Sequence, residues 1–297
     1  MKIIVLGAGA IGSLYGAKLS KSNDVTLIAR KEHADNINKN GLRITGIENR
    51  SYKLKASTKV DEIKENTLIL LTTKVYDSKS AISEIKNLLR KDTVILCLQN
   101  GLYSENIVKL IVGKKCLVLR AVTNFGAAFL NPGVVQYNSH SYTAIEKSPD
   151  EKSFAISKLF SECGLNGYVS DNIKSDMWKK LILNCVLNPV TSILRIENKG
   201  IADERLNPLK KLIVDECLKV AKKDGVDFDI DFVDAINETI KNSRNISSMQ
   251  QDLIKAKKTE IDYLNGAVAE LGKKYKIKCP VNRAMCMIIK EMEKKQD

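Results

Sequence analysis

The first half of the chain alternates short apolar runs with segments of helical periodicity. The apolar runs predict buried strands at residues 3–6, 25–28, 68–71, 94–98 and 116–119. Helical spacing of apolar residues predicts helices at 12–20 and 77–89. Further strands are expected at 134–137, 142–145 and 167–170, and a further helix at 153–160. This alternation is typical of a parallel sheet with crossover helices.

The pattern changes near residue 170. From residue 173 to residue 290 nearly every segment has helical periodicity, most clearly at 206–224 and 253–275. We therefore expect an α/β protein of two domains. A Rossmann-type parallel-sheet domain would span 1–170, and an all-helical domain, suited to substrate binding, would span 171–297.

A glycine-rich stretch follows the first apolar run directly. Its members are Gly7, Ala8, Gly9, Ala10, Ile11 and Gly12. In a strand–turn–helix unit, Gly7 would permit the tight turn, Gly9 the close approach of a pyrophosphate, and Gly12 the packing of helix on strand. The alternative is a plain strand–helix turn, because glycine-rich turns are common. Its position after a strand at the N-terminus favours a dinucleotide site.

The end of the second expected strand indicates which dinucleotide is bound. NAD-binding folds place an acidic residue here for the ribose hydroxyls, whereas this chain has Arg30, followed by Lys31. A guanidinium suits a 2′-phosphate, so NADP(H) is the expected cofactor. The alternative is a solvated loop arginine in a chain rich in cations.

Composition limits the remaining options. The 297 residues are 44% hydrophobic and 28% charged, which is ordinary for a globular protein, and no apolar stretch reaches the length of a membrane helix. Seven unpatterned cysteines favour a cytoplasmic location and argue against a disulfide framework or zinc site. The net charge of +13 is spread along the chain without interleaved aromatics, so we expect no nucleic-acid partner.

Candidate chemical groups follow two strands of the first half. Lys74 comes just after the strand at 68–71, and Asn100 just after the strand at 94–98. Ligands bind beyond the carboxyl ends of strands in open parallel sheets, so both side chains are placed to face the nicotinamide half of a cofactor. The alternatives are a solvated loop lysine and an ordinary asparagine–glycine turn.

The second half holds two further groups of candidates. Lys180, Asn184 and Asn188 recur every four residues, so they share one face of a helix among apolar residues. They either pair structurally or line a polar substrate cleft, where a partly desolvated lysine is a competent proton donor. Ser248 lies at an expected helix start and could be its N-cap, and Glu260 lies within the expected helix at 253–275, where it could be a surface carboxylate.

The sequence gives neither histidine the surroundings of a catalytic residue, and it indicates no metal site. His33 lies in a lysine-rich helix and His140 in a polar turn, and neither has an acidic neighbour at useful spacing. The chain shows no cluster of metal-ligand residue types, so no metal is expected.

Together these motifs resemble the ketopantoate reductases (2-dehydropantoate 2-reductases), essentially from end to end. The resemblance rests on four pieces in this order: the glycine motif with Arg30, the Leu-Gln-Asn-Gly turn at 98–101, Trp178-x-Lys-Leu-x-x-Asn-Cys-x-x-Asn-Pro-x-Thr191, and Ser247-Ser-Met-Gln-Gln-Asp followed by Thr259-Glu-Ile-Asp-Tyr-x-Asn-Gly266. Their order and spacing carry the match.

The resemblance implies particular roles. It makes Lys180 the proton donor and, with Glu260, the catalytic pair. Substrate-binding positions would be Lys180, Asn184, Asn188, Asn198 and Ser248, although Lys199 separates Asn198 from Gly200 where the family commonly has adjacent residues. Cofactor positions at the nicotinamide end would be Lys74, Asn100, Ala127 and Glu260, in addition to the glycine motif and Arg30.

The function that the resemblance implies is NADPH-dependent reduction of 2-dehydropantoate to (R)-pantoate in pantothenate and coenzyme A biosynthesis. Two alternatives stay open: a related NADP-dependent dehydrogenase of another 2-oxo acid or an opine-like substrate, and a non-catalytic NADP-sensing protein. The expected partner is a small 2-oxo acid, with no nucleic acid and no membrane. The sequence gives no direct indication of oligomeric state and leaves a homodimer open.

Overall fold

The computed structural model describes residues 1–294, and the chain divides into two compact units. The first, called the sheet unit below, comprises residues 1–99 and 103–173. The second, called the helical unit, comprises residues 100–102 and those from Lys174 onward. The short turn at 100–102 therefore belongs with helices that are far from it in the sequence.

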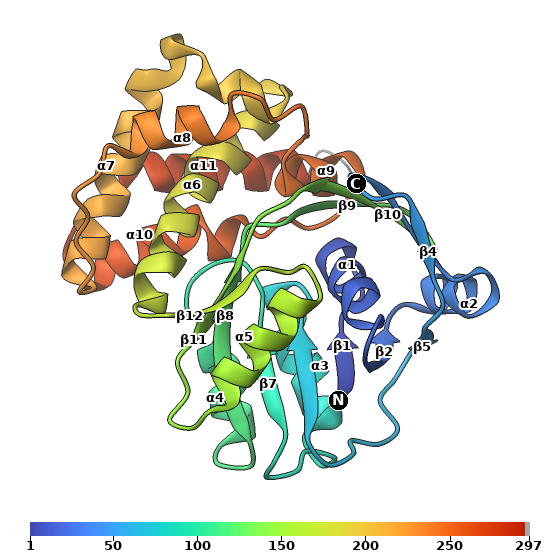
Figure 1. Cartoon of the computed structure of the whole chain (residues 1–297). Helices are drawn as coiled ribbons and strands as arrows, with labels where there is room; N and C mark the ends of the chain where they lie inside the picture. The colour runs from blue at the N-terminus through green and yellow to red at the C-terminus, as the bar shows by residue number, and fades with distance from the viewer. Residues whose placement is uncertain (295–297) are drawn as a thin grey trace. The chain divides into compact units, whose positions relative to one another are not determined.

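An eight-stranded sheet organises the sheet unit (Figure 1). Its strands are ordered β12-β11-β8-β7-β6-β1-β2-β5, and neighbours are parallel except for β8 and β11. The bounds are β1 Lys2–Leu6, β2 Asp24–Ile28, β5 Lys55–Ser57, β6 Thr67–Leu71, β7 Val94–Cys97, β8 Leu117–Thr123, β11 Thr143–Glu146 and β12 Gly167–Ser170. The strand order reverses between β1 and β6, the place where such sheets bind nucleotides.

Helices cover both faces of this sheet because its strands are apolar on both. Ile3 and Val5 of β1 belong to a core with α1 and α5, whereas Ile4 and Leu6 belong to a core with α3 and α4. The helices are α1 Ala10–Leu19, α2 Lys31–Asn40, α3 Ser78–Ile85, α4 Ser104–Val112 and α5 Lys152–Glu162, with the 3₁₀ turn η1 Val75–Asp77. The expected parallel-sheet architecture of this half is confirmed.

The sheet unit also contains a second, four-stranded sheet that the sequence pattern did not predict as such. Its order is β4-β3-β10-β9, with bounds β3 Leu42–Gly46, β4 Arg50–Tyr52, β9 Gly126–Asn131 and β10 Val134–Ser139. Only β10 was expected. Neither β3 nor β4 shows a continuous apolar run, because β3 alternates apolar and polar residues and β4 has only three residues, whereas β9 is half-buried except at its last two residues. They form because β3 pairs with β10, which lies far from it in the sequence.

The helical unit confirms the expectation of an all-helical second half over its described residues (Figure 1). Its helices are α6 Ile173–Leu194, α7 Asn207–Lys223, α8 Phe232–Ile240, α9 Ser248–Ile254, α10 Asn265–Lys274 and α11 Pro280–Lys294. Three 3₁₀ turns join them: η2 Asn198–Ala202, η3 Glu204–Leu206 and η4 Ile261–Tyr263. Over the described residues, no helix is both long enough and apolar enough to span a bilayer.

The prediction of one continuous helix over residues 253–275 is wrong. Helix α9 ends at Ile254, and Ala256 adopts a left-handed φ of 48° while the Lys257 amide donates to the Asp252 carbonyl, which closes the helix end. The next segment is then tied to α11, because both the amide and the hydroxyl of Thr259 donate to Glu293 (2.8 and 2.6 Å). Glu260 consequently precedes a 3₁₀ turn and does not lie within a helix.

Pro189 lies inside α6, where it lacks the amide that would bond the carbonyl of Cys185. The side-chain amide of Asn265 donates to that carbonyl instead (2.9 Å), and it also donates to Asn282 (3.0 Å). Asn282 in turn donates to Glu216 (2.8 Å), whose carboxylate accepts the first amides of α11. A buried polar network thus connects α6, α7, α10 and α11.

Replacing Asn265 with alanine is expected to lower the free energy of unfolding by about 1–2 kcal/mol. The substitution leaves the buried carbonyl of Cys185 without its donor, and an unsatisfied buried acceptor has a cost of this order. Urea denaturation of wild type and variant measures the difference. Asn245→Ala, at a half-buried loop position, is the comparison and should change stability less.

Candidate functional site

The three glycines of the first loop meet different steric demands. Gly7 has a φ of +102°, and a Cβ there would lie 2.6 Å from the Thr73 backbone. A Cβ on Gly12 would lie 2.5 Å from the carbonyl oxygen of Gly7. A Cβ on Gly9, in contrast, would meet no atom within 4 Å. Gly7 and Gly12 are therefore required by packing, whereas Gly9 leaves open the side from which a ligand would approach.

Two carbonyl groups of this loop accept hydrogen bonds from neighbouring hydroxyls, and one of these hydroxyls, that of Ser13, is buried. Thr72 donates to the carbonyl of Gly7 (2.8 Å), and Ser13 donates to the carbonyl of Ala8 (3.2 Å). The amides of Gly7 and Ala8 are held by the Ile28 carbonyl at the end of β2.

The first turn of α1 leaves its amides, those of Ala10, Ile11 and Gly12, without acceptors inside the helix. Gly9, at the N-cap, has no side chain to cap them. Unpaired amides and a helix dipole on an open glycine loop fit a pyrophosphate group. This loop is thus suited to hold the phosphates of a dinucleotide.

Arg30 lies beside this loop at the carboxyl end of β2. It is the N-cap residue of α2, is exposed, and follows by two residues the Ile28 carbonyl that holds the loop. Lys31 is engaged in an exposed ion pair with Asp35 (2.6 Å). Arg30 is therefore an exposed cation at the carboxyl end of β2, and its contact with the 2′-phosphate of a ribose stays a prediction.

Gln99 is a buried side chain to which the sequence pattern assigns no role. Its amide nitrogen donates to Ser78 (2.7 Å) and to the backbone carbonyl of Thr73 (3.0 Å), which ties the end of β7 to the loop after β6. Arg120, also buried, donates to the carbonyl of Gln99 (2.6 Å). These bonds fix the loop that carries half-buried Lys74. The sequence alone does not indicate these roles of Gln99 and Arg120, because their hydrogen-bond partners become neighbours only when the sheet has formed.

The structure brings together two candidates that are far apart in the sequence. Asn100 donates to Glu260 at 3.4 Å, across a separation of 160 residues. Gly101, with a φ of +80°, allows this approach because a Cβ there would lie 2.5 Å from the carbonyl oxygen of Tyr263. Glu260 is only 6% exposed, so the alternative of a surface carboxylate is wrong.

The row of polar residues on α6 is present as expected. Lys180 and Asn184 are half-buried and Asn188 is buried, while Leu181, Ile182 and Cys185 between them are fully buried. Burial raises the pKa of the Cys185 thiol, so this thiol is inert packing and not a nucleophile. The helix therefore offers one ammonium group and two amides along one face.

Asn198 is connected to the segment that leads to Ser248. Its backbone amide donates to the carbonyl of Asn245 (2.8 Å), and its side-chain amide lies 3.4 Å from the Ser243 hydroxyl. Its side-chain oxygen is buried without a hydrogen-bond partner. A buried unsatisfied acceptor is costly, and a ligand hydroxyl would satisfy it.

The N-cap of α9 is Ser247, not Ser248. The Ser247 hydroxyl accepts from the amide of Gln250 (3.2 Å) and from Thr191 of α6 (2.8 Å). Ser248 is exposed as the first helical residue. The alternative that Ser248 serves as the cap is thus wrong, and its role as a substrate ligand stays a prediction.

Alanine at these two neighbouring serines should separate capping from binding. Ser247→Ala is expected to lower the free energy of unfolding by about 1 kcal/mol because it removes the cap. Ser248→Ala should leave stability within about 0.5 kcal/mol and raise the KM of the substrate, because it removes one hydrogen bond to it. Thermal unfolding and steady-state kinetics measure the two effects, and the opposite pattern would contradict the assignment.

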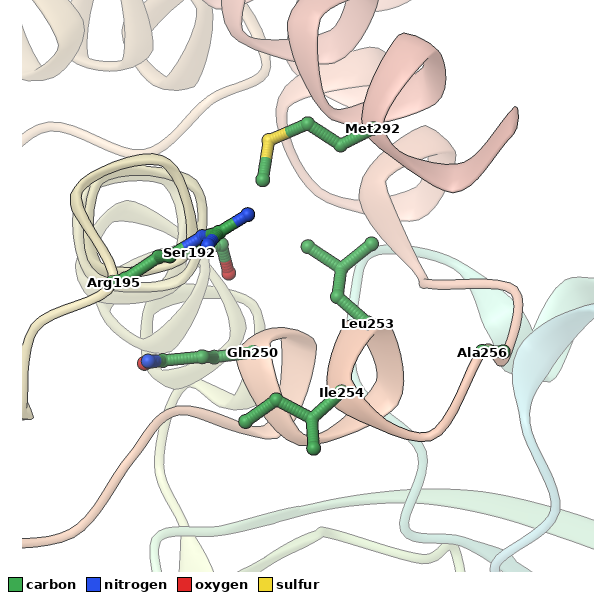
Figure 2. Close-up of a pocket in the computed structure, with 7 residues that line it drawn as sticks. All are labelled: Ser192, Arg195, Gln250, Leu253, Ile254, Ala256 and Met292. Carbon is green, nitrogen blue, oxygen red and sulfur yellow. The ribbon is translucent and has the colours of Figure 1, made fainter. Parts of the chain in front are cut away.

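Ala127 lies half-buried on β9 in the sheet unit, opposite Tyr137 of β10. Over residues 1–294, no group of three or more potential metal ligands is present. A groove of about 420 Å³ in the helical unit contains none of the candidates (Figure 2). Its lining residues are Ser192, Arg195, Gln250, Leu253, Ile254, Ala256 and Met292.

A parallel sheet with an open glycine loop, joined to a helical unit with a lysine–asparagine row, defines a nicotinamide-dependent oxidoreductase with a Rossmann-type unit. Family models agree in both parts of the chain: ketopantoate reductase PanE/ApbA matches residues 3–150, and its C-terminal model matches residues 172–293. The chain belongs to the ketopantoate reductase family. The cofactor of this family is NADP(H).

Individual relatives agree with this assignment. The 2-dehydropantoate 2-reductase of Pyrococcus horikoshii is 36% identical over 99% of this chain and 98% of its own length. A PanE/ApbA family ketopantoate reductase from Ralstonia eutropha JMP134 has 30% identity and a TM-score of 0.91, covering 100% and 99% of the two chains. A ternary structure of D-mandelate dehydrogenase with NADH and anilino(oxo)acetate has 29% identity and a TM-score of 0.88, with the same coverage.

Proposed function

We propose that this protein reduces 2-dehydropantoate to (R)-pantoate with NADPH, in the biosynthesis of pantothenate and coenzyme A. The observation that carries the proposal is the row of Lys180, Asn184 and Asn188 on one face of α6. It supplies a proton donor and neutral hydrogen-bonding groups, which a hydroxylated 2-oxo acid requires. The full-length similarity to the named Pyrococcus horikoshii reductase supports the choice of substrate.

In this proposal, one group of residues transfers a proton and another binds the substrate. The glycine loop, Lys74 and Asn100 would hold NADPH, which when bound would supply the hydride for the carbonyl carbon of the substrate. The ammonium group of Lys180 donates the proton that the carbonyl oxygen needs, so the ketone becomes a secondary alcohol. Asn184, Asn188, Asn198 and Ser248 bind the substrate's hydroxyl and carboxylate groups.

Glu260 is a positioned acceptor in this proposal. It already receives the amide of Asn100. In the liganded enzyme it would receive the substrate's hydroxyl, while Asn100 and Lys74 contact the nicotinamide end.

A second candidate function, the reduction of another 2-oxo acid, has a specific observation in its favour. The D-mandelate dehydrogenase structure, which holds NADH and an oxoacetate with an aromatic group, is nearly as similar in sequence as the Ralstonia reductase. Another 2-oxo acid, reduced to a D-2-hydroxy acid, is therefore the alternative substrate.

The loss of absorbance at 340 nm with a panel of 2-oxo acids tests the proposal. The panel contains 2-dehydropantoate, pyruvate, 2-oxoisovalerate and phenylglyoxylate, each with NADPH and with NADH. The proposal requires the highest kcat/KM for 2-dehydropantoate with NADPH. A preference for phenylglyoxylate would support the second candidate, and NADPH binding without turnover on any acid would support a sensing protein.

A further inference from the structure

His33 is a buried residue of α2 that takes no part in the proposed chemistry. It is 4% exposed, and the ring of Phe129 packs edge-on against it with centroids 4.8 Å apart. Both of its ring nitrogens have partners in the sheet unit, which together connect α1, α2 and the turn between β9 and β10.

The directions of these hydrogen bonds determine where the proton lies. The backbone amide of Gly133 donates to Nδ1 of His33 (2.9 Å), so Nδ1 carries a lone pair and the proton is assigned to Nε2. Nε2 then donates to the Ser13 hydroxyl (3.1 Å), and Ser13 donates to the carbonyl of Ala8 (3.2 Å). Burial also lowers the pKa of His33, which favours the neutral ring. The result is a one-directional chain of hydrogen bonds that ends on the glycine loop.

The hydrogen bond from Ser13 to the Ala8 carbonyl is the one that affects ligand binding. The Ala8 carbonyl belongs to the peptide unit before Gly9, where the loop is open to a ligand. A carbonyl dipole turned toward a pyrophosphate would repel it, whereas one turned inward leaves only amides facing the anion. Ser13 can hold this carbonyl inward only if its own proton points at Ala8, and the donor from His33 ensures that orientation.

We propose that His33 is a positioning residue for the cofactor, acting through Ser13 to hold the Ala8 carbonyl away from the pyrophosphate. The inference rests on the proposed binding of NADP(H) at the glycine loop. It gives His33 and Ser13 a part in nucleotide affinity although neither lies at the reacting atoms. Because the pyrophosphate is common to NADPH and NADH, the effect concerns both nucleotides equally.

Two single substitutions break the same link from opposite sides. Ser13→Ala removes the hydroxyl. His33→Asn keeps an acceptor near the position of Nδ1 for Gly133 but does not reach Ser13. Each should raise the Kd of NADPH and of NADH about three- to tenfold, the range for loss of one buried hydrogen bond. The ratio of the two Kd values should stay constant, and kcat at saturating NADPH should stay within about twofold.

A double-mutant cycle and a conservative variant distinguish this role from simple packing. The double variant Ser13→Ala/His33→Asn should bind NADPH no more weakly than the worse single variant, because both remove one link. His33→Gln, whose amide nitrogen reaches the position of Nε2, should restore most of the affinity. Tyr15→Phe is the control on the same helix, since it removes buried hydrogen bonds to Thr123 and Thr143 that do not involve the loop. It should lower thermal stability without changing either Kd.

Titration calorimetry of the nucleotides with full-length protein gives these values, and thermal unfolding checks that each variant is folded. Unchanged Kd values in folded Ser13→Ala, additive effects in the double variant, or an equal loss in Tyr15→Phe would each overturn the inference. If wild type itself binds neither nucleotide, the proposed function fails and takes this inference with it. If wild type binds NADPH and only the variants behave otherwise than expected, the inference alone is wrong.

Discussion

Lys180→Ala is expected to lower kcat by about 10²- to 10⁴-fold, the usual contribution of a positioned proton donor. The Kd of NADPH and the thermal stability should change little, because Lys180 is half-buried on α6 and lies in the helical unit, not at the glycine loop. Steady-state kinetics at saturating NADPH and 2-dehydropantoate measure the first effect. Fluorescence titration of NADPH measures the second.

Lys179 provides the matched control for this experiment. It carries the same charge one residue earlier, is exposed, and points about 100° away around the helix axis. Lys179→Ala should therefore change kcat very little. Equal losses in both variants would indicate a general effect of charge or folding, and a fully active Lys180→Ala enzyme would exclude Lys180 as the proton donor.

Arg30→Ala is expected to reduce the preference for NADPH over NADH by about ten- to a hundredfold. A charge-assisted, bidentate contact between a guanidinium and a 2′-phosphate is worth about 1.5–3 kcal/mol, and NADH offers no phosphate at that position. The kcat/KM for NADPH should fall while that for NADH stays nearly constant. The ratio of the two kcat/KM values is the measurement.

Lys39 serves as the comparison for Arg30. It is exposed in the last turn of the same helix, α2, so Lys39→Ala removes a positive charge without touching the N-terminal end. In Lys39→Ala, the ratio of the kcat/KM for NADPH to that for NADH should equal the wild-type ratio. If Arg30→Ala left the preference unchanged, the cofactor selectivity would have to come from another residue.

Much of the fold followed from local patterns in the sequence. Short continuous apolar runs and helical spacing predicted most strands of the main sheet and the change to helices after residue 170. The glycine loop and the row on α6 were also predictable, because residues close in sequence on one helix or turn have nearly fixed relative positions. Arg30 at the end of β2 belongs to the same category.

The prediction failed where local spacing carried no information. The helix expected at 253–275 breaks because Thr259 is held by Glu293 of α11 and because Ala256 adopts a left-handed conformation. Ser247 takes the cap position expected as an option for Ser248, since its hydroxyl is also held by Thr191 of α6. In each case a partner on another helix decided between two locally acceptable conformations.

The sequence by itself therefore determined the order of the elements, the glycine loop and the face of α6 that carries Lys180. Only the tertiary structure decided that Asn100 meets Glu260 and that the second sheet forms. It also decided that His33 and Ser13 support the loop. The physical reason is that these features depend on hydrogen bonds between residues up to 160 positions apart. Hydrogen-bond partners so far apart produce no periodic pattern in the sequence. They pair only when the packing of the sheet and helices buries them together.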